Sequence, residues 1–306
     1  MYLHPTGRFD NHARDYRHIE ARPLAAAMGA QICNVQVARV TDAQFAEIRD
    51  ALFRHKMIFF RDQDITHADH AALSLRFGPF AEDAYTQGVP GYRDVQPVIK
   101  EADDRSGQVF GESWHTDSPF LREPPAISTL YAVEIPPFGG DTIWANSALA
   151  YATLSDGMRK LIGGLRVHMS MRDVLKSTQE NVEQSDTPIG RLAATRDSPL
   201  SEELAAKVRG SFHPLVRTHP ETGERALYCD SSYAIGVEGL RPEESAPLLR
   251  FLAEHITQPA FTCRLRWEAR TLTLWDNRLC VHQAFNDYTG YRREMYRTTI
   301  AGEVPR

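Results

Sequence analysis

Trp114-His115-Thr116-Asp117 places a histidine and an aspartate two positions apart. On an extended chain alternate side chains point to the same side, so His115 and Asp117 could reach one metal ion. A third ligand is needed, and His282 is the candidate because it lies in the apolar, strand-like run 279–283, which follows a turn. Two imidazoles and one carboxylate leave three positions of an octahedron open, the arrangement of non-haem iron(II) oxygenases. Taken alone, a His-x-Asp pattern is also typical of hydrogen-bonded strand residues.

The segment 292–299, Arg-Arg-Glu-Met-Tyr-Arg-Thr-Thr, adds a second feature. If it is extended, Arg293, Met295, Arg297 and Thr299 share one face, and two arginines point inward. The planar guanidinium matches a carboxylate at two points, which suits a small dicarboxylate that binds a metal through its other end. The alternative is a solvated edge strand with salt bridges. The position of this segment, shortly after the third candidate ligand, favours the inward arrangement.

The remaining pattern predicts a mainly β protein with a few helices. Thr41 and Gln44 form a capping box, and the apolar spacing that follows predicts a helix over 41–55. Further helices are expected over 66–76 and 243–256. The expected strands are 57–60, 127–134, 141–145, 211–217, 225–229, 260–267, 270–275, 279–285 and 293–300. Many short strands separated by turn residues indicate a β-sandwich or jelly roll.

Composition narrows the class of protein. Apolar residues make up 42% and charged residues 25%, with no run of about 18 apolar residues, so we expect no membrane partner. A net charge of -5 without a basic block argues against nucleic acid. The N-terminus lacks an apolar signal-peptide centre and the four cysteines form no CxxC pair, so we expect a cytoplasmic protein. We expect one domain, 1–306, with a mobile lid at 169–210, where the sequence is polar and poor in aromatic residues.

Together, these residues resemble the TauD/TfdA family of taurine and dichlorophenoxyacetate dioxygenases. The resemblance covers roughly residues 20–303 and rests on four motifs, which are Trp114-His115-Thr116-Asp117, Gly139-Gly140-Asp141-Thr142, Trp275-Asp276-Asn277 followed by His282, and the arginine pair. The spacings match as well. Thr142 lies 27 residues after His115, while Arg293 and Arg297 lie 11 and 15 residues after His282.

The resemblance implies a fold, a cofactor and a set of site residues. The fold is mixed β with flanking α, built on a double-stranded β-helix (jelly roll) core. The resemblance implies Fe(II) bound by His115, Asp117 and His282, with 2-oxoglutarate and dioxygen as co-substrates. Thr142 and Arg293 would hold the distal carboxylate of 2-oxoglutarate. Arg297 would bind the anionic group of a small organic substrate. We also expect a homo-oligomer.

The substrate is expected to be an organic anion other than taurine. Taurine enzymes of the family carry a His, a Tyr and an Asn where this chain has approximately Asp83, Thr86 and Gly111. Residues 91–126 and 261–264 resemble the dichlorprop-type aryloxyalkanoate dioxygenases, which makes an aryloxyalkanoate the first candidate. Residues 141–146 and 301–305 also resemble alkylsulfatases, so alkyl sulfates or alkylsulfonates are the alternative.

The expected substrate-binding residues are Arg297, Val109, Gly111 and Tyr85. Two other classes of protein stay open on the residues alone. One is a zinc hydrolase, since three protein ligands plus water also describe catalytic zinc. The other is a metal-free jelly-roll protein that binds an organic acid through its arginines. The pairing of Arg293 with Thr142 separates the oxygenase from the hydrolase, because a hydrolase needs no dicarboxylate pocket.

Overall fold

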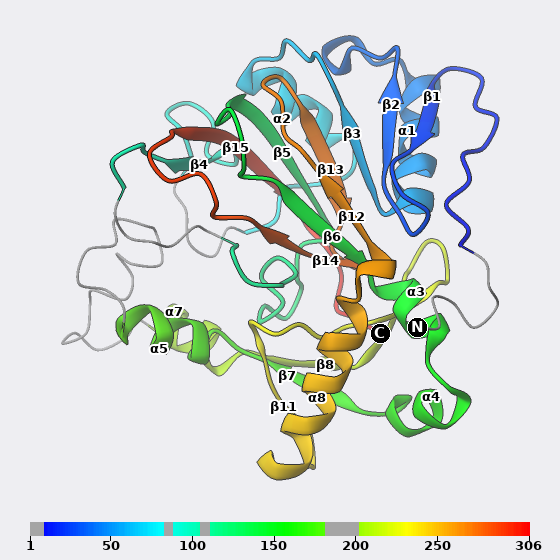
Figure 1. Cartoon of the computed structure of the whole chain (residues 1–306), viewed down its shortest axis with the longest axis vertical. Helices are drawn as coiled ribbons and strands as arrows, with labels where there is room; N and C mark the ends of the chain where they lie inside the picture. The colour runs from blue at the N-terminus through cyan, green and yellow to red at the C-terminus, as the bar shows by residue number, and fades with distance from the viewer. Residues whose placement is uncertain (1–8, 83–87, 105–110, 181–201) are drawn as a thin grey trace.

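The computed structural model describes residues 9–82, 88–104, 111–180 and 202–306 (Figure 1). Its strands are β1 (Glu20–Pro23), β2 (Ala30–Cys33), β3 (Met57–Phe60), β4 (Gln96–Lys100), β5 (Ile127–Glu134), β6 (Thr142–Asn146), β7 (Arg166–Met169), β8 (Ser211–Pro214), β9 (Val216–Thr218), β10 (Arg225–Leu227), β11 (Ala234–Val237), β12 (Thr262–Leu265), β13 (Leu272–Asp276), β14 (Cys280–Ala284) and β15 (Arg293–Ile300). Its helices are α1 (Asp42–His55), α2 (His67–Leu75), α3 (Ser147–Thr153), α4 (Asp156–Ile162), α5 (Arg172–Glu180), α7 (Glu202–Arg209) and α8 (Pro242–Ile256), with 3-10 turns η1 (Val37–Arg39) and η2 (Pro259–Phe261).

Two sheets form the jelly roll that holds the site. The larger has the strand order β1-β2-β3-β13-β5-β15-β4, and the smaller has the order β12-β6-β14. All neighbouring pairs are antiparallel except β2 and β3. A shared apolar core joins the two sheets, with Leu130, Trp275 and Met295 from the larger packing with Trp144 and Leu265 from the smaller. Side chains that alternate inward from β15, β6 and β14 therefore enter one interior.

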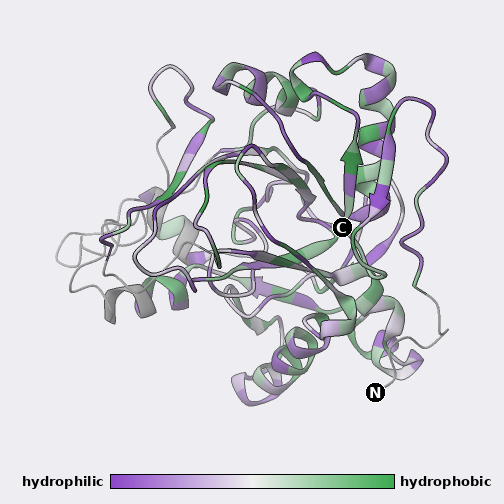
Figure 2. Cartoon of the chain, turned by 45° about the horizontal axis from the view of Figure 1, so that its top comes forward, coloured by the Kyte–Doolittle hydropathy of each residue, from purple (hydrophilic) through white to green (hydrophobic). Residues whose placement is uncertain are grey.

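Helices α1 and α2 cover the other face of the large sheet (Figure 1). Ile48 and Leu52 of α1 pack on Ile58 and Leu274, which point away from the interior of the jelly roll. The capping box expected at Thr41 is present, because its side chain accepts from the backbone of Gln44 and the Gln44 side chain accepts in return. In Figure 2 the helices carry both green and purple positions along their length, as elements with one buried face do.

A further sheet, β11-β7-β8, packs with α3, α4 and α8 in a second apolar core. Leu249, Leu252 and Ile256 supply the inner stripe of α8. Strands β9 and β10 form a separate hairpin. No helix within the described ranges is long and apolar enough to cross a membrane.

Most of the helices and strands that we predicted are present at the predicted residues. The structure differs in one strand that is divided and in several short elements that were not predicted. The expected strand 211–217 is divided into β8 and β9 at Leu215. Strands β1, β2, β4, β7 and β11 and helices α3 and α4 were not predicted, because their four to seven residues carry too little periodic signal. Within the expected lid, α5 and α7 occupy the described ends, and residues 181–201 lie outside the described residues. The cysteines are free thiols, three of them buried, while Cys33 is partly exposed.

Candidate metal centre and active site

His115, Asp117 and His282 meet inside the jelly roll. One possible ligand atom from each lies within 4.8 Å of the other two, and all three residues are buried. Residues 114–117 belong to no strand, and His115 forms a single antiparallel bridge with His282. In that bridge the His115 N–H donates to the His282 carbonyl at 2.9 Å, and the His282 N–H donates back at 2.7 Å. One bridge from a loop to β14 therefore brings the two imidazoles together.

The protonation of the three groups suits a divalent metal. Nδ1 of His115 lies 2.7 Å from the Ser113 carbonyl and donates to it, which leaves Nε2 as the nitrogen that could bind a metal. Burial, helped by the nearby His115, lowers the pKa of His282 to about 3, which keeps this imidazole neutral. Burial alone would raise the pKa of Asp117, but the charge of the nearby Arg297 guanidinium holds it below its usual value. Two neutral imidazoles and one ionised carboxylate are the donors that Fe(II) takes in an open site.

Arg293 and Arg297 both point into the same interior from β15, as the alternation of the sequence predicts. Arg293 is opposite Lys100 and Arg297 opposite Gln96 in the register with β4. Nε and Nη2 of Arg293 are buried and have no hydrogen-bond partner among the described residues. Burial lowers the pKa of Arg293, yet a guanidinium keeps its proton in any protein. A buried guanidinium with two open donors fits an anion such as the distal carboxylate of 2-oxoglutarate.

Thr142 lies on β6, across the interior from the arginines. Its Oγ1 accepts a hydrogen bond from Nε1 of Trp267 at 2.9 Å. An indole nitrogen can only donate, so the hydroxyl hydrogen of Thr142 is available for a second acceptor. The Arg293 guanidinium lies 5.8 Å from the Trp267 ring. Thr142 and Arg293 thus offer donors from opposite sheets of one pocket.

The pocket encloses about 440 Å³ of space between atoms, counting the part open to solvent. Its lining contains His115, His282, Thr142, Arg293 and Arg297 with Val98, Gly111, Leu130, Trp144, Trp275 and Ala284. Five polar groups therefore converge on an otherwise apolar cavity. Tyr85 and Val109, the other expected substrate contacts, lie outside the described residues.

Gly111 lines the pocket for a steric reason. Its φ is +81°, and a Cβ there would lie 2.9 Å from Cε1 of His115. Its carbonyl accepts from the Ala284 N–H at 2.8 Å, which ties this loop to the end of β14. A side chain at 111 would press on the imidazole, so glycine allows the loop to lie directly on a candidate metal ligand.

Four residues around the site were not predicted, namely Gln96, Ser128, Asp230 and Asn277. Gln96 Oε1 accepts from Nε of Arg297 at 3.1 Å. Asp230 is buried and accepts from three backbone N–H groups, including that of Thr116 at 3.2 Å. Only Asn277 had a signal in the sequence, since it belongs to the Trp-Asp-Asn motif. The others are common residue types at positions that only the folded chain brings to the site.

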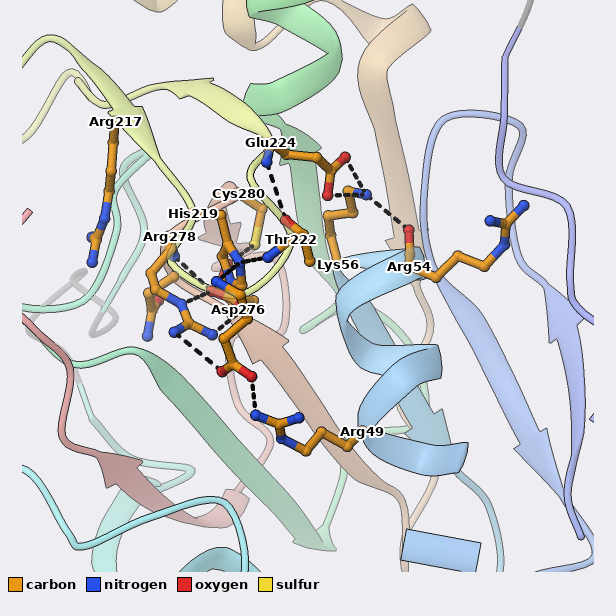
Figure 3. Close-up of polar contacts among 12 residues, drawn as sticks. Arg49, Arg54, Lys56, Arg217, His219, Thr222, Glu224, Asp276, Arg278 and Cys280 are labelled. Carbon is orange, nitrogen blue, oxygen red and sulfur yellow. Dashed lines mark hydrogen bonds and ion pairs between the residues drawn. The ribbon is translucent and has the colours of Figure 1, made fainter. Parts of the chain in front are cut away.

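The turn after β13 is held by polar contacts of Asp276 with Arg278 and His219 (Figure 3). Asp276 receives two hydrogen bonds from the guanidinium of Arg278, at 2.8 and 2.7 Å, and its Oδ2 lies 3.0 Å from Nε2 of His219. Asp276 and His219 are fully buried. The charge of Arg278, together with His219, lowers the pKa of Asp276 although burial opposes this. His219 belongs to this support rather than to the metal centre, as its lack of ligand spacing indicated.

A jelly roll with a His-Asp-His cluster and a buried arginine that has two open donors is the arrangement expected of a mononuclear metal oxygenase of the 2-oxoglutarate type. The model of the taurine catabolism dioxygenase TauD, TfdA family matches residues 20–299. The chain belongs to this family, and it is a 2-oxoglutarate-dependent dioxygenase whose cofactor is Fe(II).

Its relatives act on several organic anions. The chain is 35% identical to an alpha-ketoglutarate-dependent sulfate ester dioxygenase of Pseudomonas putida, over 94% of this chain and 91% of the relative. It is 32% identical to an alkylsulfatase of Acinetobacter baylyi, over 94% of this chain and 86% of the relative. It is 27% identical to an (S)-phenoxypropionate/alpha-ketoglutarate-dioxygenase of Sphingobium herbicidovorans, over 92% of this chain and 94% of the relative. The crystal structure of a taurine dioxygenase from Burkholderia xenovorans is similar with a TM-score of 0.76 and 36% identity, over 94% and 91% of the two chains.

Proposed function

We propose that the chain hydroxylates a small organic anion with cleavage of a C–O bond, and that a sulfate ester is the preferred substrate. One observation carries the site assignment: the candidate ligand atoms of His115, Asp117 and His282 lie within 4.8 Å of one another in the pocket where Arg293 has two donors without a partner. A metal-free binding protein would have no use for such a ligand set. A hydrolytic zinc site needs no partner for the distal carboxylate of a co-substrate.

In this proposal His115, Asp117 and His282 hold Fe(II), which when bound couples the oxidative decarboxylation of 2-oxoglutarate to insertion of oxygen into a C–H bond. Arg293 and the hydroxyl of Thr142 bind the distal carboxylate of 2-oxoglutarate. The pocket wall of Leu130, Trp144 and Trp275 excludes water from the reacting groups.

Arg297 binds the anionic group of the substrate. It is 7% exposed and lines the pocket, and its Nη1 lies 3.4 Å from Oδ1 of Asp117. An anion on this guanidinium is therefore held next to the metal ligands, so that the adjacent C–H bond faces the reacting centre. Apolar neighbours such as Val98 and Leu130 suit an alkyl or aryl group.

An alkyl sulfate, 2-oxoglutarate and O₂ give an α-hydroxyalkyl sulfate, succinate and CO₂. The new hydroxyl then loses its proton as the carbon–oxygen bond to sulfate breaks, which leaves an aldehyde, sulfate and a proton. The same collapse of an aryloxyalkanoate releases a phenol.

Sulfate esters are placed before aryloxyalkanoates on similarity, since the relatives named for sulfate esters are 35% and 32% identical, against 27% for the phenoxypropionate enzyme. This reverses the order that the sequence motifs favoured. Aryloxyalkanoates are the second candidate, because Trp144 and Trp275 offer aromatic surface to an aryl group. The solved taurine dioxygenase is 36% identical, yet taurine is disfavoured because Gly111, at the approximate position of an asparagine in taurine enzymes, offers no side chain. We further propose that the enzyme is cytoplasmic and homo-oligomeric.

A substrate panel tests the proposal. Purified enzyme with Fe(II), 2-oxoglutarate and O₂ is given hexyl sulfate, hexanesulfonate, each enantiomer of dichlorprop, or taurine, and substrate-dependent succinate is measured. We expect the largest rate with hexyl sulfate, together with equimolar aldehyde and sulfate. Asp117→Ala should abolish succinate release. Turnover of taurine alone, or unchanged turnover by Asp117→Ala, would contradict the substrate or the ligand assignment respectively.

A further inference from the structure

Ser128 is bonded directly to the carboxylate of a candidate metal ligand. Its Oγ lies 2.5 Å from Oδ2 of Asp117, and Ser128 is fully buried. Ser128 is on β5, two positions before Leu130, so alternation places both side chains on the face that lines the pocket. At this distance the hydroxyl donates a strong hydrogen bond to the ionised carboxylate.

The two oxygens of Asp117 consequently have different surroundings. Oδ2 accepts from Ser128, whereas Oδ1 is the atom that lies 3.9 Å from Nε2 of His115 and 3.4 Å from Nη1 of Arg297. Rotation of the carboxylate about its last bond would exchange the two oxygens. The hydrogen bond from Ser128 opposes that rotation, and Oδ1 stays directed toward the imidazole.

Asn277 holds Ser128 in turn. Its Nδ2 donates to Oγ of Ser128 at 2.8 Å, and its Oδ1 accepts from Nε1 of Trp275 at 2.9 Å. The indole nitrogen can only donate, so it fixes which end of the amide faces Ser128. Because the serine oxygen already accepts from Asn277, its hydrogen is directed to Asp117. The hydrogen bonds run in one direction, from Trp275 and Asn277 through Ser128 to the carboxylate.

We propose that Ser128 is a positioning residue of the metal centre, which presents Oδ1 of Asp117 as the ligand oxygen and is itself oriented by Asn277. The inference rests on the proposed function in one respect, namely that Asp117 binds the metal. Partners of metal ligands typically contribute 10- to 100-fold to metal affinity, so a loss of that order is expected when the hydroxyl is removed.

Binding of Mn(II) to the metal-free enzyme, followed by the electron paramagnetic resonance signal of free Mn(II), tests this without turnover. Ser128→Ala should raise the Kd for Mn(II) by roughly 10- to 100-fold. Thr273→Val is the matched control, because this residue on β13 is also fully buried but its hydroxyl has no partner among the described residues. The control should bind Mn(II) within about twofold of wild type. Urea unfolding of each variant separates metal affinity from stability.

Ser128→Cys provides a second variant of similar volume with a much weaker donor, and it covers the case in which Ser128→Ala does not fold. Its Kd should also rise, by roughly fivefold or more. Folded Ser128 variants that bind Mn(II) like wild type, while Asp117→Ala does not bind it, would overturn the role of Ser128 and leave the proposed function intact. Failure of the wild type to bind Mn(II) would overturn both.

Discussion

Replacing Arg293 with methionine is expected to raise the stability of the protein while abolishing its affinity for 2-oxoglutarate. The arginine is 3% exposed, and Nε and Nη2 have no hydrogen-bond partner among the described residues. Without a bound anion, the desolvation of this charge is only partly compensated. Replacing buried charges with apolar side chains of similar size is often stabilising by about 1–4 kcal/mol. Methionine has a similar length and its apolar chain suits the neighbouring Trp267 ring.

The loss of binding follows from the same two donors. A hydrogen bond to a charged group contributes about 1.5–3 kcal/mol, so two of them contribute about 3–6 kcal/mol. The affinity for 2-oxoglutarate should therefore fall by roughly 10²- to 10⁴-fold. The effects on stability and on binding have opposite signs because the guanidinium is retained for its ligand and costs stability without it.

Two measurements on the same preparations check this prediction. Urea unfolding without metal or 2-oxoglutarate gives the free energy of unfolding. Anaerobic titration of the Fe(II) enzyme with 2-oxoglutarate, followed by visible charge-transfer absorption, gives the affinity. Arg22→Met is the control, because this arginine side chain is 63% exposed, and it should leave the free energy of unfolding unchanged within the error of the measurement. The reasoning is refuted if Arg293→Met loses more than about 1 kcal/mol of stability while folded, or binds 2-oxoglutarate normally.

Three further perturbations follow from the structure. Gln96→Glu would place a carboxylate against Nε of Arg297, where it would compete with the anionic group of the substrate. The affinity for hexyl sulfate should fall roughly tenfold or more, equivalent to about 1.4 kcal/mol, while the affinity for 2-oxoglutarate is retained. A variant that binds hexyl sulfate as tightly as wild type would contradict the role of Arg297 in binding the substrate. Burial lowers the pKa of His70 to about 3, so the unfolded chain takes up this proton first as the pH falls. The free energy of unfolding is therefore unaffected by protonation of His70 above about pH 6.5, and below that pH it declines by up to about 1.4 kcal/mol per pH unit. Urea unfolding at pH 7, 6 and 5 measures how the free energy of unfolding depends on pH. This dependence should be weaker in His70→Gln than in wild type, and an unchanged dependence would contradict a neutral, buried His70. Asp276→Ala should cost about 3–5 kcal/mol in urea unfolding, because Arg278 is left buried without its main partner, and a loss below about 1 kcal/mol would show that this support is dispensable.

Much of the fold could be predicted because long elements carry a repeated signal. The capping box at Thr41 and the apolar spacing after it predict α1 almost to the residue, and the run 293–300 coincides with β15. Elements of four residues, such as β1 and β2, were missed. They exist because the neighbouring strands accept their hydrogen bonds, which a local pattern does not contain.

The sequence by itself determined the types of the site residues and their order along the chain. Alternation in β15 was enough to place Arg293 and Arg297 on one face, because a strand fixes the direction of every second side chain. The sequence did not determine how His115 reaches His282, which the structure achieves by a single bridge between a loop and β14 and not by two strands.

Tertiary structure alone decided what surrounds those residues. Ser128 is 11 residues from Asp117 along the chain and Gln96 is 201 residues from Arg297, yet each forms a buried hydrogen bond to its partner. Serine and glutamine occur throughout any sequence and no local periodicity marks these two, so their roles come only from strand register and from burial. The His-x-Asp pattern indicated a metal ligand, and the fold supplied the hydrogen bond that orients its carboxylate.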